Sequence, residues 1–289
     1  MRRLVRLASA LLLVGHSASA APRYAVTGMV LTVDRSHRTF SASVEAIPGY
    51  MPAMVMPFEV VRTTDLEGLT PGAIVELTLV VPQRSARAEH IRVLRYQRVE
   101  QDPFTANRLK LLNQITAGGS TARAVEIGQA VPDFTLIDQT RRPVRLSGLR
   151  GRVVVINFIY TSCALPDFCL RAANNFGVLK KRFKAELGWD LVLLTVTFDP
   201  VRDAPDVLAR YASQWNADAA TWHFLTGLMP DVHRVYSLFG VDAFPEEGLM
   251  NHSLHTAIID RQGRLVVNLE GNQYTAAQLG DLTQTVLHP

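Results

Sequence analysis

Apolar and polar positions alternate in short runs over residues 24–96, and this pattern gives way to long apolar runs after about residue 126. The short runs are YAVTGMVLTV, FSASVEA, FEVV, AIVELTLVV and HIRVLRY, and turn-forming residues separate them. Five short segments with a period of two predict a small all-β domain, either a closed barrel or a sandwich.

The second part of the chain has an α/β pattern. VVVINFIY (153–160) and LVLLTVTF (191–198) are almost continuously apolar, as in strands that helices cover on both faces. A helical pattern covers 171–187, and Asp203 is placed to cap a second helix that ends near Ser213. The remaining segments are WHFLTG, HTAIID and RLVVNLE, which read as strands, and TAAQLGDLTQTVL, which reads as a helix. The order β–α–β–α–β–α–β–β–α predicts a thioredoxin-like domain.

The region between the two patterns separates them into domains. ANRLKLLNQI reads as a short helix, and TAGGSTAR after it reads as a flexible tether. We therefore predict a leader at 1–20, a β-barrel domain at 21–97, a linker with a short helix at 98–125 and the thioredoxin-like domain at 126–289.

The first twenty residues have the layout of a secretory signal peptide. Three arginines precede a short apolar stretch, and Ala18-Ser19-Ala20 is an A-x-A cleavage signal. The stretch is far shorter than the roughly 20 residues that span a bilayer. We predict a periplasmic or otherwise exported protein, soluble after cleavage near Ala20 and without a membrane span. Cleavage removes the three arginines, so the formal charge falls from +4 to +1, and no long basic run remains to indicate a nucleic-acid partner.

The only two cysteines, Cys163 and Cys169, lie in TSCALPDFCL. A structural disulfide is one interpretation in an exported protein, but closing so short a loop removes little entropy from the unfolded chain. A redox couple or a metal site is therefore favoured. On one straight helix the sulfurs would lie about 9 Å apart along the axis. Pro166 and Asp167 instead predict an open loop that brings them together. A helix beginning near Leu170 would direct its N-terminus at the loop and favour the thiolate of Cys169.

Two histidines precede a predicted strand in NHSLHTAIID, and this strand should run beside the cysteine loop. Two thiols and one imidazole are soft and borderline donors that suit copper. Thioredoxin-type oxidoreductases usually carry a proline immediately before this strand, whereas residues 251–257 contain none. The segment thus favours a metal site over general disulfide exchange.

The motifs PDFTLIDQ, TVTFDPVRD, WHFLTG and NHS…IIDRQGRL, with the cysteine loop, resemble the Sco/SenC family of copper chaperones for cytochrome oxidase assembly. The resemblance covers roughly residues 130–288. It implies that Cys163, Cys169 and His252 bind copper as Cu(I) or Cu(II), while His255 does not match the motif. Asp199 within FDPVRD is typical of the family, and we expect it to serve capping and turn chemistry, not metal binding. Five residues separate the cysteines here, where the family usually has three.

What the resemblance implies about function is an exported copper metallochaperone that delivers copper to a subunit of a respiratory oxidase. Two alternatives stay open. In one, Cys163 and Cys169 are the redox pair of a thiol–disulfide reductase, which keeps a partner's metal-binding cysteines reduced and is served by a periplasmic thiol reductant. In the other, the protein is a copper or redox sensor.

Three methionines lie close together in EAIPGYMPAMVMPF. On a strand, Met54 and Met56 project from one face about 6.6 Å apart, and thioethers select Cu(I). The alternative is that they fill gaps in the barrel core. The stretch resembles the W-P-x-M-x-M pattern of periplasmic CusF-like copper-binding domains, which implies an OB-like barrel with Met54 and Met56 as Cu(I) ligands and Met51 as a possible third. Met51 takes the place of the family's tryptophan, and Ser43 and Val44 that of its histidine.

Overall fold

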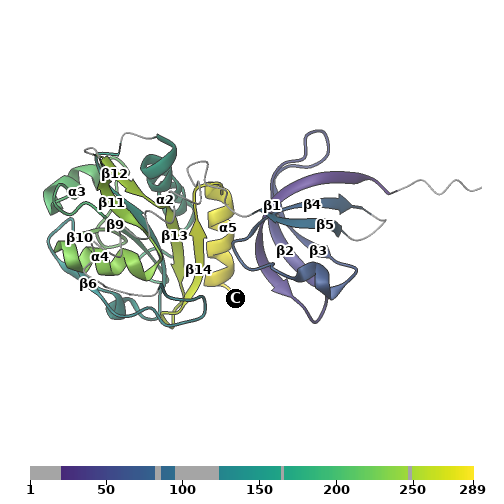
Figure 1. Cartoon of the computed structure of the whole chain (residues 1–289), viewed down its shortest axis with the longest axis horizontal. Coiled ribbons are helices and arrows are strands. Elements are labelled where there is room, and N and C mark those ends of the chain that lie inside the picture. The colour runs from purple at the N-terminus through teal and green to yellow at the C-terminus, as the bar shows by residue number, and fades with distance from the viewer. Residues whose placement is uncertain (1–20, 82–85, 95–123, 164–165, 247–248) are drawn as a thin grey trace, which may run out of the picture.

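The computed structural model describes residues 21–81, 86–94, 124–163, 166–246 and 249–289. They form a small β-domain and a larger α/β domain, joined side by side along the C-terminal helix (Figure 1). The predicted signal peptide, and most of the predicted linker with its short helix, lie outside these residues. The predicted domain boundaries remain predictions.

The N-terminal domain is the predicted all-β domain, a closed barrel with the strand order β1-β2-β3-β5-β4. Its strands are β1 Arg23–Asp34, β2 Thr39–Val44, β3 Met54–Glu59, β4 Ile74–Val80 and β5 Arg87–Leu94. A short 3-10 turn, η1 (Thr63–Leu66), follows β3. The stacked rings of Phe40 and Phe58 lie in the core. The strand expected at FEVV begins earlier, at Met54, and so includes two of the three methionines. The finer OB-like form stays a prediction.

A seven-stranded sheet forms the centre of the second domain, in the order β14-β13-β8-β9-β10-β6-β7. The strands are β6 Thr135–Asp138, β7 Pro143–Arg145, β8 Val153–Ile159, β9 Leu191–Thr197, β10 Trp222–Thr226, β13 His255–Ile259 and β14 Leu265–Glu270. Every residue of β8 and β9 is buried, as their continuous apolar runs predict. Strands β8, β9 and β10 are parallel, so their carboxyl ends share one edge of the sheet.

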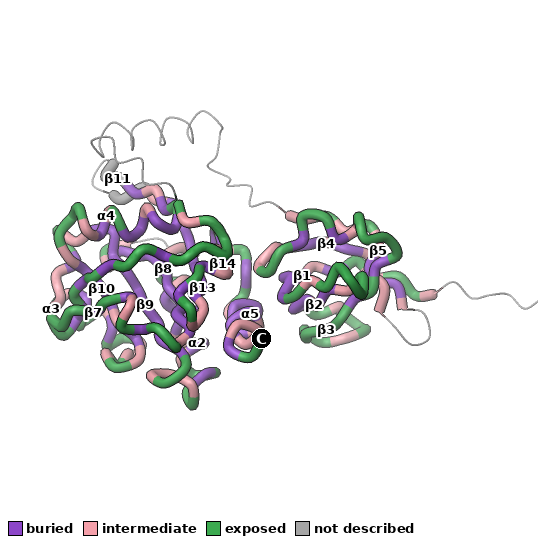
Figure 2. The backbone as a smooth tube through the Cα atoms, turned by 90° about the horizontal axis from the view of Figure 1, so that it is seen from below, coloured by how far each residue is buried: buried purple, intermediate pink, exposed green. Residues whose placement is uncertain are grey.

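The helices cover both faces of this sheet (Figure 2). They are α2 Arg171–Arg182, α3 Pro205–Ser213, α4 Met229–Leu238 and α5 Ala276–Leu287. The succession β8-α2-β9-α3-β10-α4-β13-β14-α5 is the predicted thioredoxin-like order. Two additional hairpins were not predicted, namely β6–β7 and the pair of β11 (Ala243–Glu246) and β12 (Leu249–His252). Helix α2 ends five residues before the predicted end, at Arg182.

Helix α5 joins the two domains. Met29 and Leu31 of the barrel are buried in the same apolar cluster as Leu279 and Leu282 of α5. Gly72 approaches so closely that an added Cβ would lie 2.6 Å from a methyl carbon of Leu269. Its φ of +90° is also a conformation that glycine adopts without strain. The barrel is therefore packed against the second domain through apolar contacts.

Polar contacts beside this cluster fix the orientation of the barrel. The hydroxyl of Ser43, a buried residue on β2, donates a 2.6 Å hydrogen bond to the carboxylate of Asp281 on α5. Arg182 forms a 2.7 Å ion pair with the same carboxylate. The side-chain amide of Gln278 donates to the backbone carbonyl of Ser43 at 3.5 Å. One turn of α5 thus binds the end of β2.

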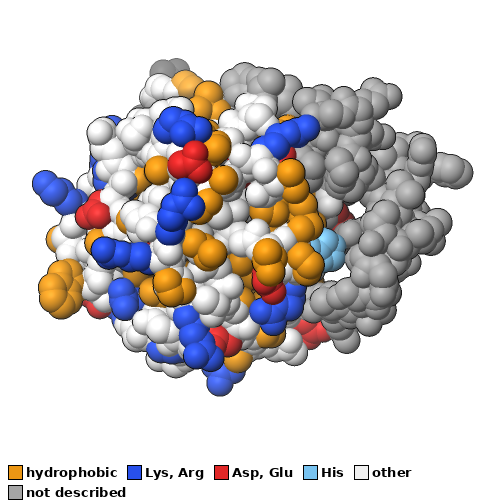
Figure 3. All heavy atoms as spheres, turned by 90° about the vertical axis from the view of Figure 1, so that its left-hand side faces the viewer, with side chains coloured by type: hydrophobic (Ala, Val, Ile, Leu, Met, Phe, Trp, Pro, Cys, Tyr) orange, Lys and Arg blue, Asp and Glu red, His pale blue; other side chains and the backbone are white. Residues whose placement is uncertain are grey.

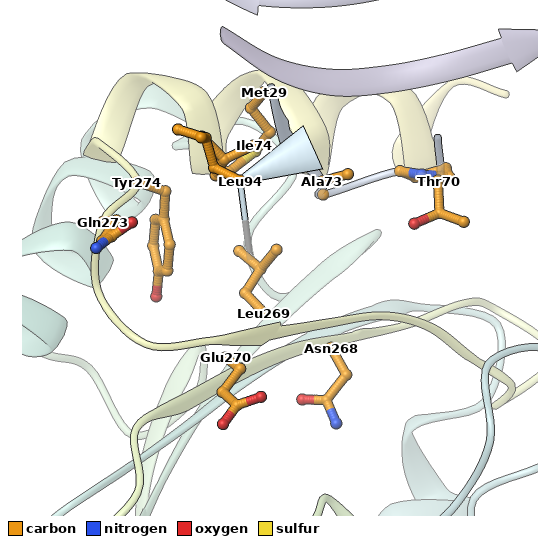
Figure 4. A pocket seen from close by; sticks show the side chains of 12 residues that line it. Met29, Thr70, Ala73, Ile74, Leu94, Asn268, Leu269, Glu270, Gln273 and Tyr274 are labelled. Carbon is orange, nitrogen blue, oxygen red and sulfur yellow. The ribbon is translucent and has the colours of Figure 1, made fainter. Parts of the chain in front are cut away.

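A cavity of about 520 Å³ lies between the domains (Figure 4). The barrel lines it with Met29, Ile74 and the segment 70–73, and the second domain with residues 268–270 and Tyr274. The amide of Asn268 already bonds to His255 and to the carbonyl of Phe239, and the hydroxyl of Tyr274 donates to Thr256. The side chains of Asn268 and Tyr274 at the cavity wall therefore already have partners within the protein.

The surface shows no extended basic patch on the face in Figure 3, where Lys and Arg side chains alternate with acidic and apolar ones. Within the described part of the chain, the helices are too short or too polar to cross a bilayer.

Candidate metal centre

The cysteine segment follows the buried strand β8 at the carboxyl edge of the sheet. The N–H of Cys163 faces the carbonyl of Tyr160 at 3.4 Å, which turns the chain away from the strand. A π-helical turn, η3 (Pro166–Leu170), then leads directly into α2. As predicted, one continuous helix does not include both cysteines, because Cys163 lies outside the helical turn. The open loop predicted from Pro166 and Asp167 is wrong from Pro166 onward, because proline is tolerated in the first turn of a helix. Cys163 precedes the helical turn and Cys169 lies within it.

This arrangement brings together the three residues that the sequence singled out. The sulfurs of Cys163 and Cys169 and an imidazole nitrogen of His252 all lie within 4.8 Å of one another. Sγ of Cys169 lies 3.9 Å from Nε2 of His252. Two donor atoms bound to one ion at about 2.0–2.3 Å are at most roughly 4.6 Å apart. The three donors therefore fit one ion after a small closure.

The fold brings His252 to the cysteines through strand pairing. His252 ends β12, and β13, which begins three residues later, pairs antiparallel with β8. His255, which does not match the family motif, is buried in the sheet, and its Nδ1 lies 3.1 Å from the side-chain oxygen of Asn268. Although the two histidines are only three residues apart, His252 therefore lies at the cluster and His255 lies in the sheet.

A backbone contact orients the ring of His252. Its Nδ1 lies 3.2 Å from the carbonyl of Ser253, and an N–H donated there leaves Nε2 with a lone pair directed at the sulfurs. The rings of Tyr160, Phe168 and Phe198 surround the imidazole at centroid distances of 5.7, 6.4 and 4.4 Å. These rings restrict water around the donors and hold the imidazole in place.

The predicted preference for a thiolate at Cys169 is wrong for the metal-free protein. A hydrogen bond with the sulfur of Cys163, followed by burial, raises the pKa of the Cys169 thiol. The residue is only 1% exposed, whereas Cys163 is half-buried. Both side chains are thiols in this structure, not a disulfide. A bound cation would have to displace the proton of Cys169, so loading is coupled to proton release.

Asp203 is a buried carboxylate close enough to the cluster to affect Cys169, and the sequence predicted a different role for it, as a helix cap. Helix α3 has Ala204 as its N-cap, and Asp203 does not cap it. Instead, the carboxylate accepts hydrogen bonds from the backbone N–H and hydroxyl of Thr161 and from the hydroxyl of Thr197. Threonines at the carboxyl ends of two apolar strands were the available signal for this contact. Asp199, as predicted, serves the turn, because its carbonyl accepts the N–H groups of Arg202 and Asp203.

The methionine segment lies at one end of the barrel. Met54 pairs with Val44 and Met56 with Ala42, so both thioethers share a face of β3, as predicted. Met54 is 48% exposed, whereas Met56 packs partly against the barrel core. Met51 precedes the strand, where its backbone bridges to Ile47 and its side chain touches the same core.

The histidines of the barrel lie away from these methionines. His37 bonds to Asp34 in the β1–β2 turn, at the opposite end of β2 from the Met54 pairing. His90 lies on β5, which meets β3 only at Glu59. The side chain of Ser43, in the place of the expected histidine, faces Asp281 instead.

Comparison with known proteins agrees with both resemblances. The SCO1/SenC family model matches residues 123–287, and the model of the copper-binding periplasmic protein CusF matches residues 23–92. A protein of Stutzerimonas stutzeri, named as a candidate copper-binding protein, is 30% identical over 164 residues, which cover 53% of this chain and 78% of that protein. The SCO1 protein homolog of Bacillus subtilis is 25% identical over 180 residues, covering 58% and 92%.

Among solved structures, ScoI of Arabidopsis thaliana with copper bound is 22% identical and has a TM-score of 0.47, covering 55% of this chain and 96% of that one. The family match extends over more than half of the chain and includes the β8 strand, the cysteine segment and His252. The chain belongs to the SCO1/SenC family and carries a CusF-like domain at its N-terminal end.

Proposed function

We propose that this protein is an exported copper metallochaperone that binds copper through Cys163, Cys169 and His252. The observation that supports this proposal is the convergence of two thiols and one imidazole within 4.8 Å at the edge of the sheet. Two sulfur donors and one nitrogen suit Cu(I), and the same set accepts Cu(II). Cys163 and His252 are half-buried, so a partner's ligands can reach the ion from their side.

The acceptor we propose is a copper centre of a respiratory oxidase, in line with the family to which the chain belongs. Transfer requires no catalytic turnover: incoming ligands replace the imidazole and then the thiolates, while the thiolates regain protons. The raised pKa of Cys169 favours that last step, because its thiol is readily re-formed once the ion leaves. Secretion through the signal peptide at 1–20, with cleavage after Ala20, belongs to the same proposal, as do the domain limits 21–97 and 126–289.

We further propose that the barrel binds Cu(I) through Met54 and Met56, with Met51 as the third ligand. The two strand methionines share one face, and the exposed Met54 is accessible to an incoming ion. Thioethers carry no proton near neutral pH, so this site would load without proton release. An OB-like barrel is supported by the strand order and by the parallel contact between β3 and β5.

An anaerobic titration of the reduced full-length chain with Cu(I), against a competing chelator, tests both sites. We expect two bound ions in the wild type and one in each of the variants Cys163→Ser/Cys169→Ser and Met54→Leu/Met56→Leu. His252→Ala should weaken binding at the first site, whereas His255→Ala, a matched histidine outside the cluster, should not. Unchanged copper binding without the two cysteines would refute the thiolate site.

The cysteine geometry also supports a second function, that of a thiol–disulfide reductase. The half-buried Cys163 would attack a partner's disulfide, and the adjacent buried Cys169 would resolve the mixed disulfide. A mixed disulfide trapped on Cys169→Ser, but not on Cys163→Ser, would favour this function. The absence of a trapped mixed disulfide on Cys169→Ser would argue against it.

A further inference from the structure

Asp203 is a buried carboxylate that holds the start of the cysteine segment. It is fully buried and accepts the N–H of Thr161 at 3.0 Å and the hydroxyl of Thr197 at 2.5 Å. The hydroxyl of Thr161 donates to its other oxygen. Thr161 lies two residues before Cys163, so these bonds fix the point from which the segment leaves β8. The carboxylate therefore connects two strand ends at the cluster.

All three of these donors are neutral. They stabilise the negative charge of Asp203 through hydrogen bonds, but no positive charge among the described residues neutralises it. The nearby guanidinium of Arg202 pairs with Asp199 instead, at 3.2 Å. Within the described ranges, no basic side chain forms an ion pair with Asp203. Burial raises the pKa of Asp203, while the threonine bonds act in the opposite direction. The negative charge of Asp203 also contributes to the raised pKa of Cys169, so its field reaches the cluster.

We propose that Asp203 is a positioning residue whose charge favours Cu(II) over Cu(I) at the cluster of Cys163, Cys169 and His252. This inference rests on the proposed copper function. Two thiolates with Cu(I) have a net charge of −1, whereas the same ligands with Cu(II) are neutral. A fixed negative charge nearby raises the energy of the first complex and leaves the second almost unaffected. Asp203 would thereby set how readily the protein holds each oxidation state.

The test compares two substitutions that separate charge from position. Asp203→Asn removes the charge and keeps the size of the side chain, whereas Thr197→Val keeps the charge and removes one hydrogen bond. Affinities of the full-length chain for Cu(I) and Cu(II) are measured by chelator competition. Two like unit charges roughly 10 Å apart, at an effective dielectric constant of about 20, shift an equilibrium about tenfold. We expect Asp203→Asn to shift the Cu(II)/Cu(I) affinity ratio toward Cu(I) by about this factor.

Thr197→Val should leave the Cu(II)/Cu(I) affinity ratio unchanged, because it lowers the affinity for Cu(I) and for Cu(II) by the same factor. If Asp203→Asn lowers the affinities for Cu(I) and Cu(II) by the same factor, Asp203 has only a structural role and the proposal is overturned. Unchanged affinities for both ions would overturn it too. Far-UV circular dichroism establishes folding, and Asp203→Ser serves as a second neutral variant if the asparagine variant does not fold.

Amide hydrogen exchange of Thr161 in the metal-free protein gives a readout that does not need copper. Asp203→Ser should speed this exchange selectively, because it removes the acceptor of the Thr161 N–H, and unchanged exchange would contradict the positioning role. If the wild-type cluster binds no copper at all, the copper function and the oxidation-state preference both fail. Exchange at Thr161 then still decides whether Asp203 positions the segment.

Discussion

A single hydroxyl in the barrel should affect the stability of the other domain. Ser43→Ala removes the hydrogen bond to Asp281 and changes no apolar contact of the interface. A hydrogen bond to a charged group contributes about 1.5–3 kcal/mol. Asp281 keeps its ion pair with Arg182, and 17% of its side chain is exposed, so we expect a loss near the lower limit, about 1.5 kcal/mol.

Tryptophan fluorescence reports the unfolding of the second domain alone, so it can detect the effect of a substitution in the barrel on that domain. Trp189, Trp215 and Trp222 are the only tryptophans of the chain, and all three lie in the second domain. A substitution in the barrel can therefore shift the fluorescence transition only through the contact between the domains. For a unit of 150–250 residues, a loss of about 1.5 kcal/mol lowers the melting temperature by roughly 3–6 °C.

Ser41→Ala is the matched control for this experiment. Ser41 lies on the same strand, two residues away, and its hydroxyl bonds to Thr32 at the barrel surface, 2.6 Å away. Exposed hydrogen bonds between neutral groups contribute little, so we expect a shift of less than about 2 °C. If Ser43→Ala and the control shift the tryptophan transition equally, the bond between Ser43 and Asp281 does not couple the domains in solution.

Three further substitutions test individual elements. Gly72→Ala should lower the melting temperature measured by calorimetry, because the added methyl would meet Leu269 in a backbone conformation with φ of +90°; an unchanged melting temperature would mean that the domains lie further apart. Thr275→Ala should cost about 1 kcal/mol in urea unfolding, because its hydroxyl caps α5, and a loss below about 0.3 kcal/mol would contradict this role. The ion pair with Arg145 lowers the pKa of Asp133 to about 2, so its contribution to stability is complete above the ordinary carboxyl value of 3.8 and is lost as the pH falls toward 2. Asp133→Asn should therefore be less stable than the wild type at pH 6 and equal to it near pH 2, and a difference that is independent of pH would refute this.

The sequence predicted those parts of the fold whose hydrophobic pattern is long and regular. The continuous apolar runs at 153–160 and 191–198 became fully buried parallel strands, and helix α2 between them followed from its helical pattern. The hairpins β6–β7 and β11–β12 were missed because strands of three or four residues are too short to show alternation.

The cluster was predicted as a set of residues, but its chemistry was only partly predicted. The two cysteines could be named because they are the only ones in the chain, and His252 could be chosen over His255 because it matches the motif of the Sco/SenC family. The protonation of Cys169 could not be predicted, because it depends on burial and on the other sulfur, which are tertiary properties. The role of Asp203 was missed for a similar reason. An aspartate just before a helix that begins with proline predicts a cap, whereas in the fold the ends of two strands bring Thr161 and Thr197 close enough to donate hydrogen bonds to it.

The first turns of helix α5 connect the two candidate copper sites mechanically. Arg171, two residues after Cys169, donates to the carbonyl of Tyr274 just before α5 begins. The next turns of α5 hold Ser43, whose neighbour on β2 pairs with Met54. A series of contacts through α5 and β2 therefore links the cluster to the methionine segment, and the two donor sets belong to different domains. If the barrel must undock for the two proposed sites to exchange copper within one chain, Ser43→Ala should speed that exchange, whereas exchange between two chains should not depend on this contact.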